Sequence, residues 1–395
     1  MTDGATGGAI EMIQRLVGFD TVSARSNLAL IEFVRDYLSG YGIESRLTFD
    51  AGGGKANLFA TIGGPAEGGG VVLSGHTDVV PVEGQPWESD PFHVVARDGR
   101  LYGRGTADMK SFLAVALALV PEVRKRELKV PIHLALSYDE EVGCLGVPAL
   151  LRDVADALPR PPRLAIIGEP TMMRVANRHK GIHAFETRVT GRDGHSSGTH
   201  RGVNAIVHAA EIIGFLDALA AEQRRQGPFE EGFDPPYTTI NVGTVEGGTA
   251  LNIIPRHCAF RWEFRPVPAT DPADLLTRVE TFVAESVLPR MRAVAAEAEV
   301  VTVARCAVPP LLPEADSPAE TLARALTGAN AAIGAAFVTE AGLFQQAGIP
   351  AVVCGPGSIE QAHQPNEYIA LDQVAACEAF LRRLIDWAAA GRRLP

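Results

Sequence analysis

The order of hydrophobic patterns along the chain constrains its fold more than any other feature, because that order changes twice. Before Pro170, helical and strand patterns alternate as they do in an α/β domain. The next segment is typical of a split ferredoxin-like unit, with the order strand, helix, strand, strand, helix, strand at residues 180–190, 202–220, 237–245, 259–264, 272–287 and 299–304. From Pro309 the α/β pattern resumes. We therefore predict an α/β domain formed by residues 1–179 and 309–395, with residues 180–308 inserted as a second domain.

Length and charge narrow the class of protein. A chain of 395 residues exceeds the size at which one hydrophobic core keeps growing, which agrees with two domains. The net charge is −11 and the acidic residues are scattered, which disfavours nucleic acid or an anionic membrane surface as a partner. The longest apolar run, residues 112–120, is too short to cross a bilayer.

The amino terminus and the cysteines indicate a cytoplasmic protein. No cationic segment followed by an apolar one stands at the start of the chain, so we expect no export. The five cysteines are odd in number and widely spaced, and none forms a CxxC pair. We expect them to be reduced core residues rather than disulfides or a zinc knuckle.

Residues of the kind that bind metals follow several predicted strands. Val71, Val72 and Leu73 form a buried strand pattern, Gly75 permits a turn, and His76 and Asp78 follow. Open α/β sheets place their sites at the carboxyl ends of strands. Later strand ends deliver Glu140 with Glu141, and then Glu169, while Asp108 enters a helix and His363 lies in a loop before the last helix.

Each of these residues has an ordinary explanation when it is taken alone. Acidic residues at helix starts are favoured by the helix dipole, an acidic pair after a strand is often a solvated turn, and His363 could be any loop histidine. Together they supply the imidazoles and carboxylates, from different elements, that a pair of divalent ions needs.

Six segments, in order, resemble the dinuclear zinc aminoacylases. They read SGHTDVVP, GRGTADMK, SYDEEVG, GEP, GRDGHSS and GSIEQAHQP, and the resemblance extends over nearly the whole chain. This family includes acetylornithine deacetylase, succinyl-diaminopimelate desuccinylase, aminoacylase and carboxypeptidase G. The resemblance implies a mixed-sheet α/β metallohydrolase domain with an inserted ferredoxin-like α+β domain that serves as lid and dimerisation domain.

The resemblance also implies a role for each residue of the site. Asp108 would bridge two Zn²⁺ ions, His76 and Glu169 would complete one of them, and Glu141 and His363 the other; Co²⁺ would be able to substitute. Glu140 would take a proton from water held between the ions and pass it to the leaving amine. Asp78 would orient His76. The peptide bond from Asp108 to Met109 would be cis.

The resemblance further implies roles for residues of the inserted domain and a class of substrate. His195 would stabilise the oxyanion, in dimeric relatives from the partner subunit, which implies a homodimer through the inserted domain. Asn252 and Arg265 match residues that bind the substrate carboxylate in the family. The substrate would be a small N-acyl amino acid.

Three stretches resemble acetylornithine deacetylase in particular, namely SYDEEVGCLG, TEAGLF and CGPGSIEQAHQP. Acetylornithine would then be hydrolysed to ornithine and acetate, a step of arginine biosynthesis. Glu340 is a candidate counter-charge for the distal ammonium group of ornithine. A desuccinylase, a broader aminoacylase or a dipeptidase would share the metal centre. An inactive relative that only binds an amino acid would be expected to have lost a ligand or the base, and the sequence retains them all.

Overall fold

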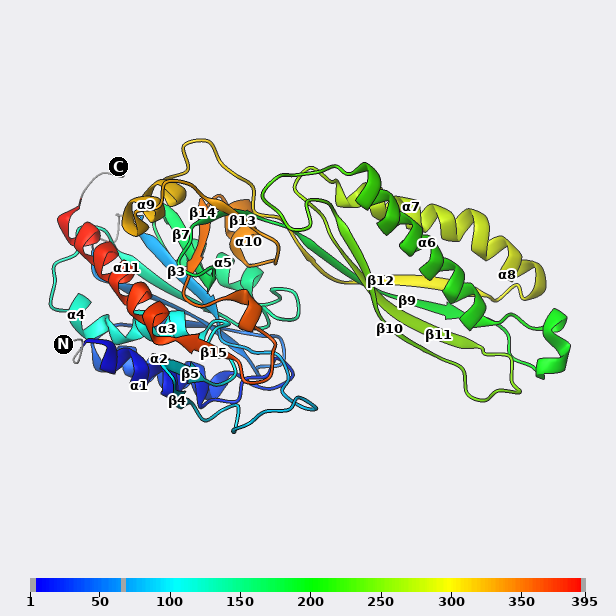
Figure 1. The fold of residues 1–395 in the computed structure, drawn as a ribbon, viewed down its shortest axis with the longest axis horizontal. Coiled ribbons are helices and arrows are strands. Elements are labelled where there is room, and N and C mark those ends of the chain that lie inside the picture. The colour runs from blue at the N-terminus through cyan, green and yellow to red at the C-terminus, as the bar shows by residue number, and fades with distance from the viewer. Residues whose placement is uncertain (1–4, 65–68, 392–395) are drawn as a thin grey trace. The chain divides into compact units, whose positions relative to one another are not determined.

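The computed structural model describes residues 5–64 and 69–391, and these form two compact units. Unit 1 comprises Met1–Arg178, Leu311–Ala335 and Thr339–Pro395, and unit 2 comprises His179–Pro310 and Ala336–Val338 (Figure 1). Unit 1 holds a large mixed sheet with helices, and unit 2 an antiparallel sheet with helices. The predicted fold class, a mixed α/β domain with an inserted α+β domain, is confirmed.

The central sheet of unit 1 has the strand order β1-β2-β6-β3-β7-β14-β8-β13. Strand β3 is parallel to β6 and β7, and β14 is parallel to β7, whereas β1, β2 and β8 pair antiparallel. The strands are β1 (Ser45–Phe49), β2 (Ala56–Ile62), β3 (Val71–His76), β6 (Ile132–Ser137), β7 (Leu164–Pro170), β8 (Ala176–His179), β13 (Ile333–Ala335) and β14 (Ala351–Gly355). The four parallel strands are buried along their whole length, in keeping with their mainly apolar sequences. Their carboxyl ends lie at one edge, where the candidate ligands follow.

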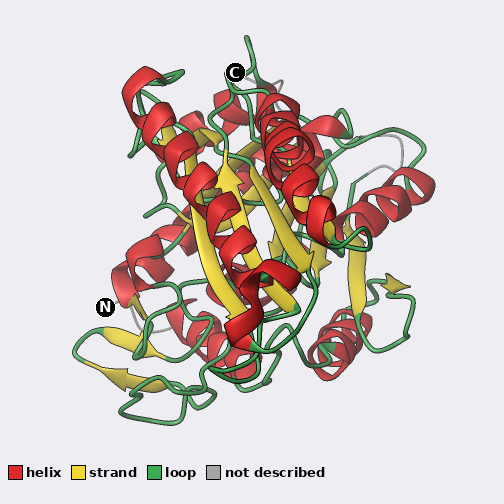
Figure 2. Ribbon diagram, turned by 90° about the vertical axis from the view of Figure 1, so that its right-hand side faces the viewer, coloured by secondary structure: helices red, strands yellow, loops and turns green. Residues whose placement is uncertain are grey.

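Helices pack against this sheet. Figure 2 colours the helices and strands of both units by type. They are α1 (Ala5–Val17), α2 (Leu28–Gly40), α3 (Lys110–Ala118), α4 (Val120–Val123), α5 (Val147–Ala157), α9 (Pro318–Thr327), α10 (Ala341–Gln346) and α11 (Leu371–Ala390). Helix α3 is buried from Lys110 to Leu117 and contacts α1, α11 and strands β3 and β7. A helix that is apolar on all sides has to be enclosed in this way. This enclosure fixes the start of α3, and with it Asp108.

Unit 1 also contains a small three-stranded sheet, in which the pairing of β15 with β5 was not predicted from the sequence. It has the order β15-β5-β4, with β4 (Val95–Arg97), β5 (Arg100–Tyr102) and β15 (Tyr368–Ala370). Strands β4 and β5 form a short hairpin within the otherwise irregular segment from Pro81 to Gly105. Pairing of β15 with β5 brings the segment after His363 beside the segment before Asp108.

Unit 2 is built as the ferredoxin-like pattern predicts. Its sheet has the antiparallel order β10-β11-β9-β12, from β9 (Ile182–Thr190), β10 (Thr239–Gly247), β11 (His257–Arg265) and β12 (Glu299–Val308). The other elements are η1 (Ser196–Arg201), α6 (Ala205–Gln226), α7 (Pro272–Phe282), a π-helical turn at Val283–Val287 and α8 (Leu288–Val294). Alternate residues of β11, namely Cys258, Phe260, Trp262 and Phe264, are buried in a core shared with α6 and α7.

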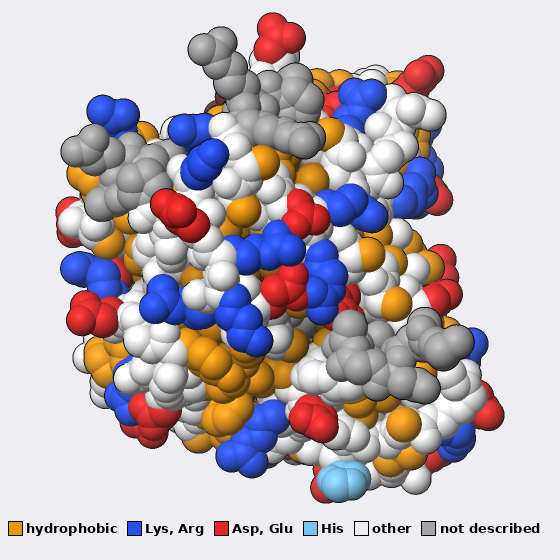
Figure 3. Space-filling view, turned by 90° about the vertical axis from the view of Figure 1, so that its left-hand side faces the viewer, with side chains coloured by type: hydrophobic (Ala, Val, Ile, Leu, Met, Phe, Trp, Pro, Cys, Tyr) orange, Lys and Arg blue, Asp and Glu red, His pale blue; other side chains and the backbone are white. Residues whose placement is uncertain are grey.

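The surface charges, the helix lengths and the cysteines of the described residues are as follows. On the face of the molecule shown in Figure 3, basic side chains are interspersed with acidic ones. Within residues 5–64 and 69–391, every helix is too short or too polar to span a lipid bilayer. All five cysteines are free thiols.

Candidate metal centre

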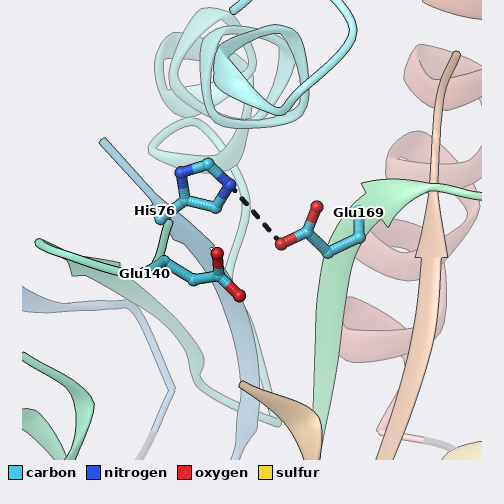
Figure 4. Close-up of side chains that lie close together, drawn as sticks. All are labelled: His76, Glu140 and Glu169. Atoms are coloured by element: carbon cyan, nitrogen blue, oxygen red, sulfur yellow. Dashed lines mark ion pairs between the residues drawn. The ribbon is translucent and has the colours of Figure 1, made fainter. Parts of the chain in front are cut away.

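The carboxyl ends of three neighbouring strands bring the candidate ligands together. His76 is the last residue of β3, Glu140 and Glu141 follow β6, and Glu169 is the next-to-last residue of β7. Figure 4 shows that the side chains of His76, Glu140 and Glu169 point toward one another. This convergence follows from the parallel pairing of β3 with β6 and β7.

The distances divide the ligands into two overlapping groups. The ligand atoms of His76, Glu140 and Glu169 all lie within 4.8 Å of one another, and so do those of His76, Asp108 and Glu141. His76 Nε2 lies 3.0 Å from Asp108 Oδ1 and 3.5 Å from Glu169 Oε1. The peptide bond from Asp108 to Met109 is cis, as the resemblance implies.

His363 joins the second group from the loop after β14. Its Nε2 lies 3.0 Å from Glu141 Oε2 and 3.5 Å from Asp108 Oδ2. Its side chain is 53% exposed, whereas those of Asp108 and Glu141 are each 8% exposed. The site thus has one buried imidazole and one imidazole at the surface of unit 1, with Asp108 in contact with both.

The electrostatics of the centre are those of carboxylates crowded together. Burial, and then repulsion from Glu141 and Asp108, raise the pKa of Glu140 to about 8. Burial and the charge of Asp108 raise the pKa of Glu141 to about 7, and they also raise the pKa of Glu169. Burial opposes ionisation of Asp108, but hydrogen bonds with His363 and His76 hold its pKa below the ordinary value. Only two imidazoles offset four carboxylates here.

This donor set fits two divalent cations. Hydrogen bonds to Asp108 and Glu141 raise the pKa of His363 to about 10, so protons on the imidazoles supply the positive charge that the carboxylates attract. Divalent ions would supply more of that charge. Imidazole nitrogen and carboxylate oxygen are ordinary ligands of Zn²⁺, and Asp108 presents one oxygen toward each histidine.

Asp78 acts on the site differently from the role expected for its side chain. His76 Nδ1 lies 2.9 Å from the main-chain oxygen of Asp78, whereas the carboxylate oxygen Oδ1 is 3.7 Å away. The carboxylate instead accepts hydrogen bonds from the main-chain N–H groups of Glu140 and Glu141, at 3.1 and 3.3 Å, and from Ser23 Oγ at 2.7 Å. Asp78 therefore orients His76 through its backbone and holds the Glu140–Glu141 turn through its side chain.

Glu340 does not lie where a substrate could contact it, so the expected role is corrected. The residue is fully buried at the start of α10. Ser137 Oγ donates to one of its carboxylate oxygens at 2.8 Å, and Ser74 Oγ donates to the other. These serines belong to β6 and β3, so Glu340 ties together the ends of the two strands that carry ligands.

Glu367 is a residue of the site that the sequence reasoning missed. It is buried, and its carboxylate accepts main-chain hydrogen bonds from the loop that carries Asp108. The signal available in the sequence was an acidic residue four positions after His363 and directly before an apolar segment. Nothing in a linear pattern shows that β15 pairs with β5, which is what places Glu367 beside that loop.

The three candidate residues of the inserted domain lie in unit 2. His195 is exposed, and its Nδ1 accepts a hydrogen bond from the N–H of Ser197, so a neutral ring carries its proton on Nε2. The carbonyl of Asn252 accepts a hydrogen bond from Ser196, and His195 forms a β-bridge with Ile253, so His195 and Asn252 are neighbours. Arg265 ends β11 and donates to Glu263 at 2.9 Å.

Comparison with known proteins identifies relatives of the whole chain. The model of peptidase family M20/M25/M40 matches residues 72–387. Acetylornithine deacetylase of Myxococcus xanthus is 36% identical over 390 residues, covering 96% of this chain and 97% of that protein.

Two solved structures share the fold. The M20 family metallo-carboxypeptidase Sso-CP2 from Sulfolobus solfataricus has a TM-score of 0.77 at 18% identity, covering 97% of this chain and 99% of that one. The YXEP protein of Bacillus subtilis, described as a dinuclear metal binding peptidase, has a TM-score of 0.62 at 17% identity, covering 99% of each chain.

Proposed function

Because the chain belongs to peptidase family M20/M25/M40, whose members are metal-dependent hydrolases, we propose that it removes the acetyl group from N2-acetyl-L-ornithine. The observation that carries this proposal is the convergence of histidine and carboxylate ligands in a chain that is 36% identical, over nearly its full length, to an acetylornithine deacetylase. The products would be L-ornithine and acetate, and the reaction would serve arginine biosynthesis.

We assign two Zn²⁺ ions to the centre, with Co²⁺ as an effective substitute. The proposed ligands are Asp108 between the two ions, His76 and Glu169 for one, and Glu141 and His363 for the other, in keeping with the distances among them. When bound, such ions lower the pKa of water and polarise an amide carbonyl.

Glu140 is the proposed general base and acid. Its carboxylate is close to His76 and Glu169, and its main-chain N–H is held by Asp78. Its pKa near 8 in the protein without metal is set by burial and neighbouring carboxylates. In the reaction it takes a proton from water and returns it to the nitrogen of the leaving amine.

Residues of unit 2 are proposed to act on the substrate. The Nε2–H of His195 would donate to the oxyanion that develops on the amide carbonyl. Arg265 would bind the substrate's α-carboxylate, for which a guanidinium offers two parallel donors, and the amide of Asn252 would add a further contact.

We further propose a cytoplasmic homodimer that associates through unit 2. Val301 and Val303 are about two-fifths exposed on β12, which is an edge strand of the unit 2 sheet. Exposed apolar residues on an edge strand favour pairing with another chain. The proposed cytoplasmic location has a separate support, because the free thiols agree with a reducing compartment. Sedimentation velocity of the wild type against Val301→Lys/Val303→Lys would test the dimer.

The test of the substrate is a direct comparison of three compounds. Release of free amine would be measured from N2-acetyl-L-ornithine, N-succinyl-diaminopimelate and N-acetyl-L-methionine, with protein stripped of metal and reloaded with Zn²⁺ or Co²⁺. We expect metal-dependent turnover with the highest kcat/KM for acetylornithine. A higher kcat/KM for either competitor would assign the chain to the desuccinylases or to the broader aminoacylases.

A further inference from the structure

A single buried carboxylate holds the loop that carries Asp108. Oε1 of Glu367 accepts hydrogen bonds from the main-chain N–H groups of Ala107 at 2.8 Å and Asp108 at 3.1 Å. Oε2 accepts from the N–H of Gly105 at 3.0 Å. Glu367 is 1% exposed. Three hydrogen bonds within four residues fix the backbone path that leads into the bridging aspartate.

The fold brings Glu367 to this loop through the small sheet of unit 1. Tyr368 of β15 pairs with Tyr102 of β5, and the N–H of Gly103 donates to the carbonyl of Glu367 at 2.9 Å. Gly105 has a φ of +84°, and a Cβ there would lie 2.9 Å from a methyl group of Val79. The loop is therefore tightly packed on one side and hydrogen-bonded to Glu367 on the other.

Arg104 balances the charge of Glu367 and extends the network. Its Nη1 lies 2.7 Å from Glu367 Oε2, and the side chains of both residues are 1% exposed. Its Nη2 donates to Gln85 Oε1 at 2.6 Å, and its guanidinium lies over the ring of Trp87, with Cζ 5.1 Å from the ring centroid. A buried ion pair with this many hydrogen bonds is confined to one geometry.

The same network reaches the loop of the second histidine. Gln85 Nε2 donates to the main-chain oxygen of His363 at 2.9 Å. A continuous path of hydrogen bonds thus runs from Asp108 through Glu367, Arg104 and Gln85 to the backbone of His363. His363 is the more exposed of the two histidines, and this hydrogen bond joins its backbone to the buried network.

We propose that Glu367 is a positioning residue which, with Arg104 and Gln85, sets Asp108 and His363 in the geometry that binds the two metal ions. This inference rests on the proposed metal-dependent function. Residues that orient metal ligands in this way typically contribute about 10- to 100-fold to metal affinity. Because Asp108 is assigned to both ions, loss of Glu367 weakens both. Of the assigned metal ligands, Gln85 contacts His363 alone, through the main-chain oxygen, so its loss weakens the ion assigned to His363.

The experiment is a Co²⁺ titration of protein stripped of metal, in which binding is measured by calorimetry and by the visible absorption of the bound ion. Glu367→Gln keeps the size of the side chain and removes its charge, and we expect affinity for both ions to fall by about 10- to 100-fold, with an altered absorption spectrum. Gln85→Ala, in a partly exposed loop, should weaken only one ion. Glu360→Gln, an exposed residue of the His363 loop, is the matched control and should bind as the wild type does.

A purely structural role predicts a different pattern. Glu367→Gln would then unfold at a lower temperature without metal, yet would bind two Co²⁺ ions with wild-type affinity and spectrum, and this result would overturn the inference. If Glu367→Gln fails to fold, Gln85→Ala decides: wild-type affinity for both ions would also overturn it. Failure of the wild type itself to bind two ions would instead refute the proposed function.

Discussion

Replacement of Glu140 by glutamine separates the chemistry from metal binding. Its carboxylate accepts a weak hydrogen bond from Cys144 Sγ to Oε1 at 3.4 Å. Burial, and then repulsion from Glu141 and Asp108, raise its pKa to about 8. Glutamine removes a charge that its neighbours repel, so we expect the free energy of unfolding without metal to change by less than about 1 kcal/mol.

The expected loss of activity is much larger than that change in stability. A positioned general base contributes about 10²- to 10⁴-fold in rate, which corresponds to about 3–5 kcal/mol in the activation barrier. Glu141→Gln provides the comparison, because Glu141 lies 3.0 Å from His363 and is assigned as a ligand. It should lose affinity for one ion as well as activity.

The assay measures three quantities for both variants: kcat on N2-acetyl-L-ornithine, metal content after dialysis, and melting temperature without metal. We expect Glu140→Gln to keep two ions per chain and to lose at least about 100-fold in kcat. If it loses metal as Glu141→Gln does, the roles of the two glutamates have been exchanged. Retention of wild-type kcat would refute the assignment of Glu140 as the base.

Three further predictions concern stability and specificity. Gly168→Ala should destabilise the protein by about 1–3 kcal/mol, because the new Cβ would lie 2.0 Å from the Phe112 ring. Gly214→Ala, in an open position on α6, should stabilise it by about 0.5–1 kcal/mol. Equal effects of the two substitutions in thermal melts would refute the packing argument. Hydrogen bonds from Arg305 and Arg188 lower the pKa of Glu186 from 4.5 to about 2, so the stabilisation they give is present above pH 4.5 and is lost as the pH falls toward 2. The melting-temperature advantage of the wild type over Glu186→Gln should shrink across that interval. A difference that stays constant with pH would contradict this direction of the pKa shift. Glu340→Gln should lower the melting temperature and leave the ratio of kcat/KM for acetylornithine and acetylmethionine unchanged, since the carboxylate binds Ser74 and Ser137; a changed ratio would restore its direct contact with substrate.

Elements with strong local signals were predictable from the sequence. Helix α9 (Pro318–Thr327) has such signals at both ends, because Ser317 caps the first turn and Gly328 adopts the left-handed conformation after the last. The buried strands β3, β6 and β7 each contain a run of apolar residues, so their carboxyl ends, and the candidate ligands at or after them, could be located. Short strands such as β4, β5 and β15 span three residues each and have no period to detect.

The partners of buried polar groups could not be predicted. That Asp78 contacts His76 through a main-chain oxygen depends on the local backbone, and residue types carry no record of it. Glu340 and Glu367 contact residues more than 200 positions away, because strand pairing brings distant segments together. The sequence therefore shows that a carboxylate is present, but only the fold shows which groups that carboxylate contacts.

The most direct test of the central claim is recovery of activity as metal is returned to stripped protein. Turnover of N2-acetyl-L-ornithine would be measured against equivalents of Zn²⁺ added per chain, with Glu360→Gln in parallel to control for non-specific binding by exposed carboxylates. The ligand assignment predicts negligible turnover without metal and a maximum at two equivalents. Full turnover by protein shown to contain no metal, or a chain that binds no Zn²⁺, would contradict it.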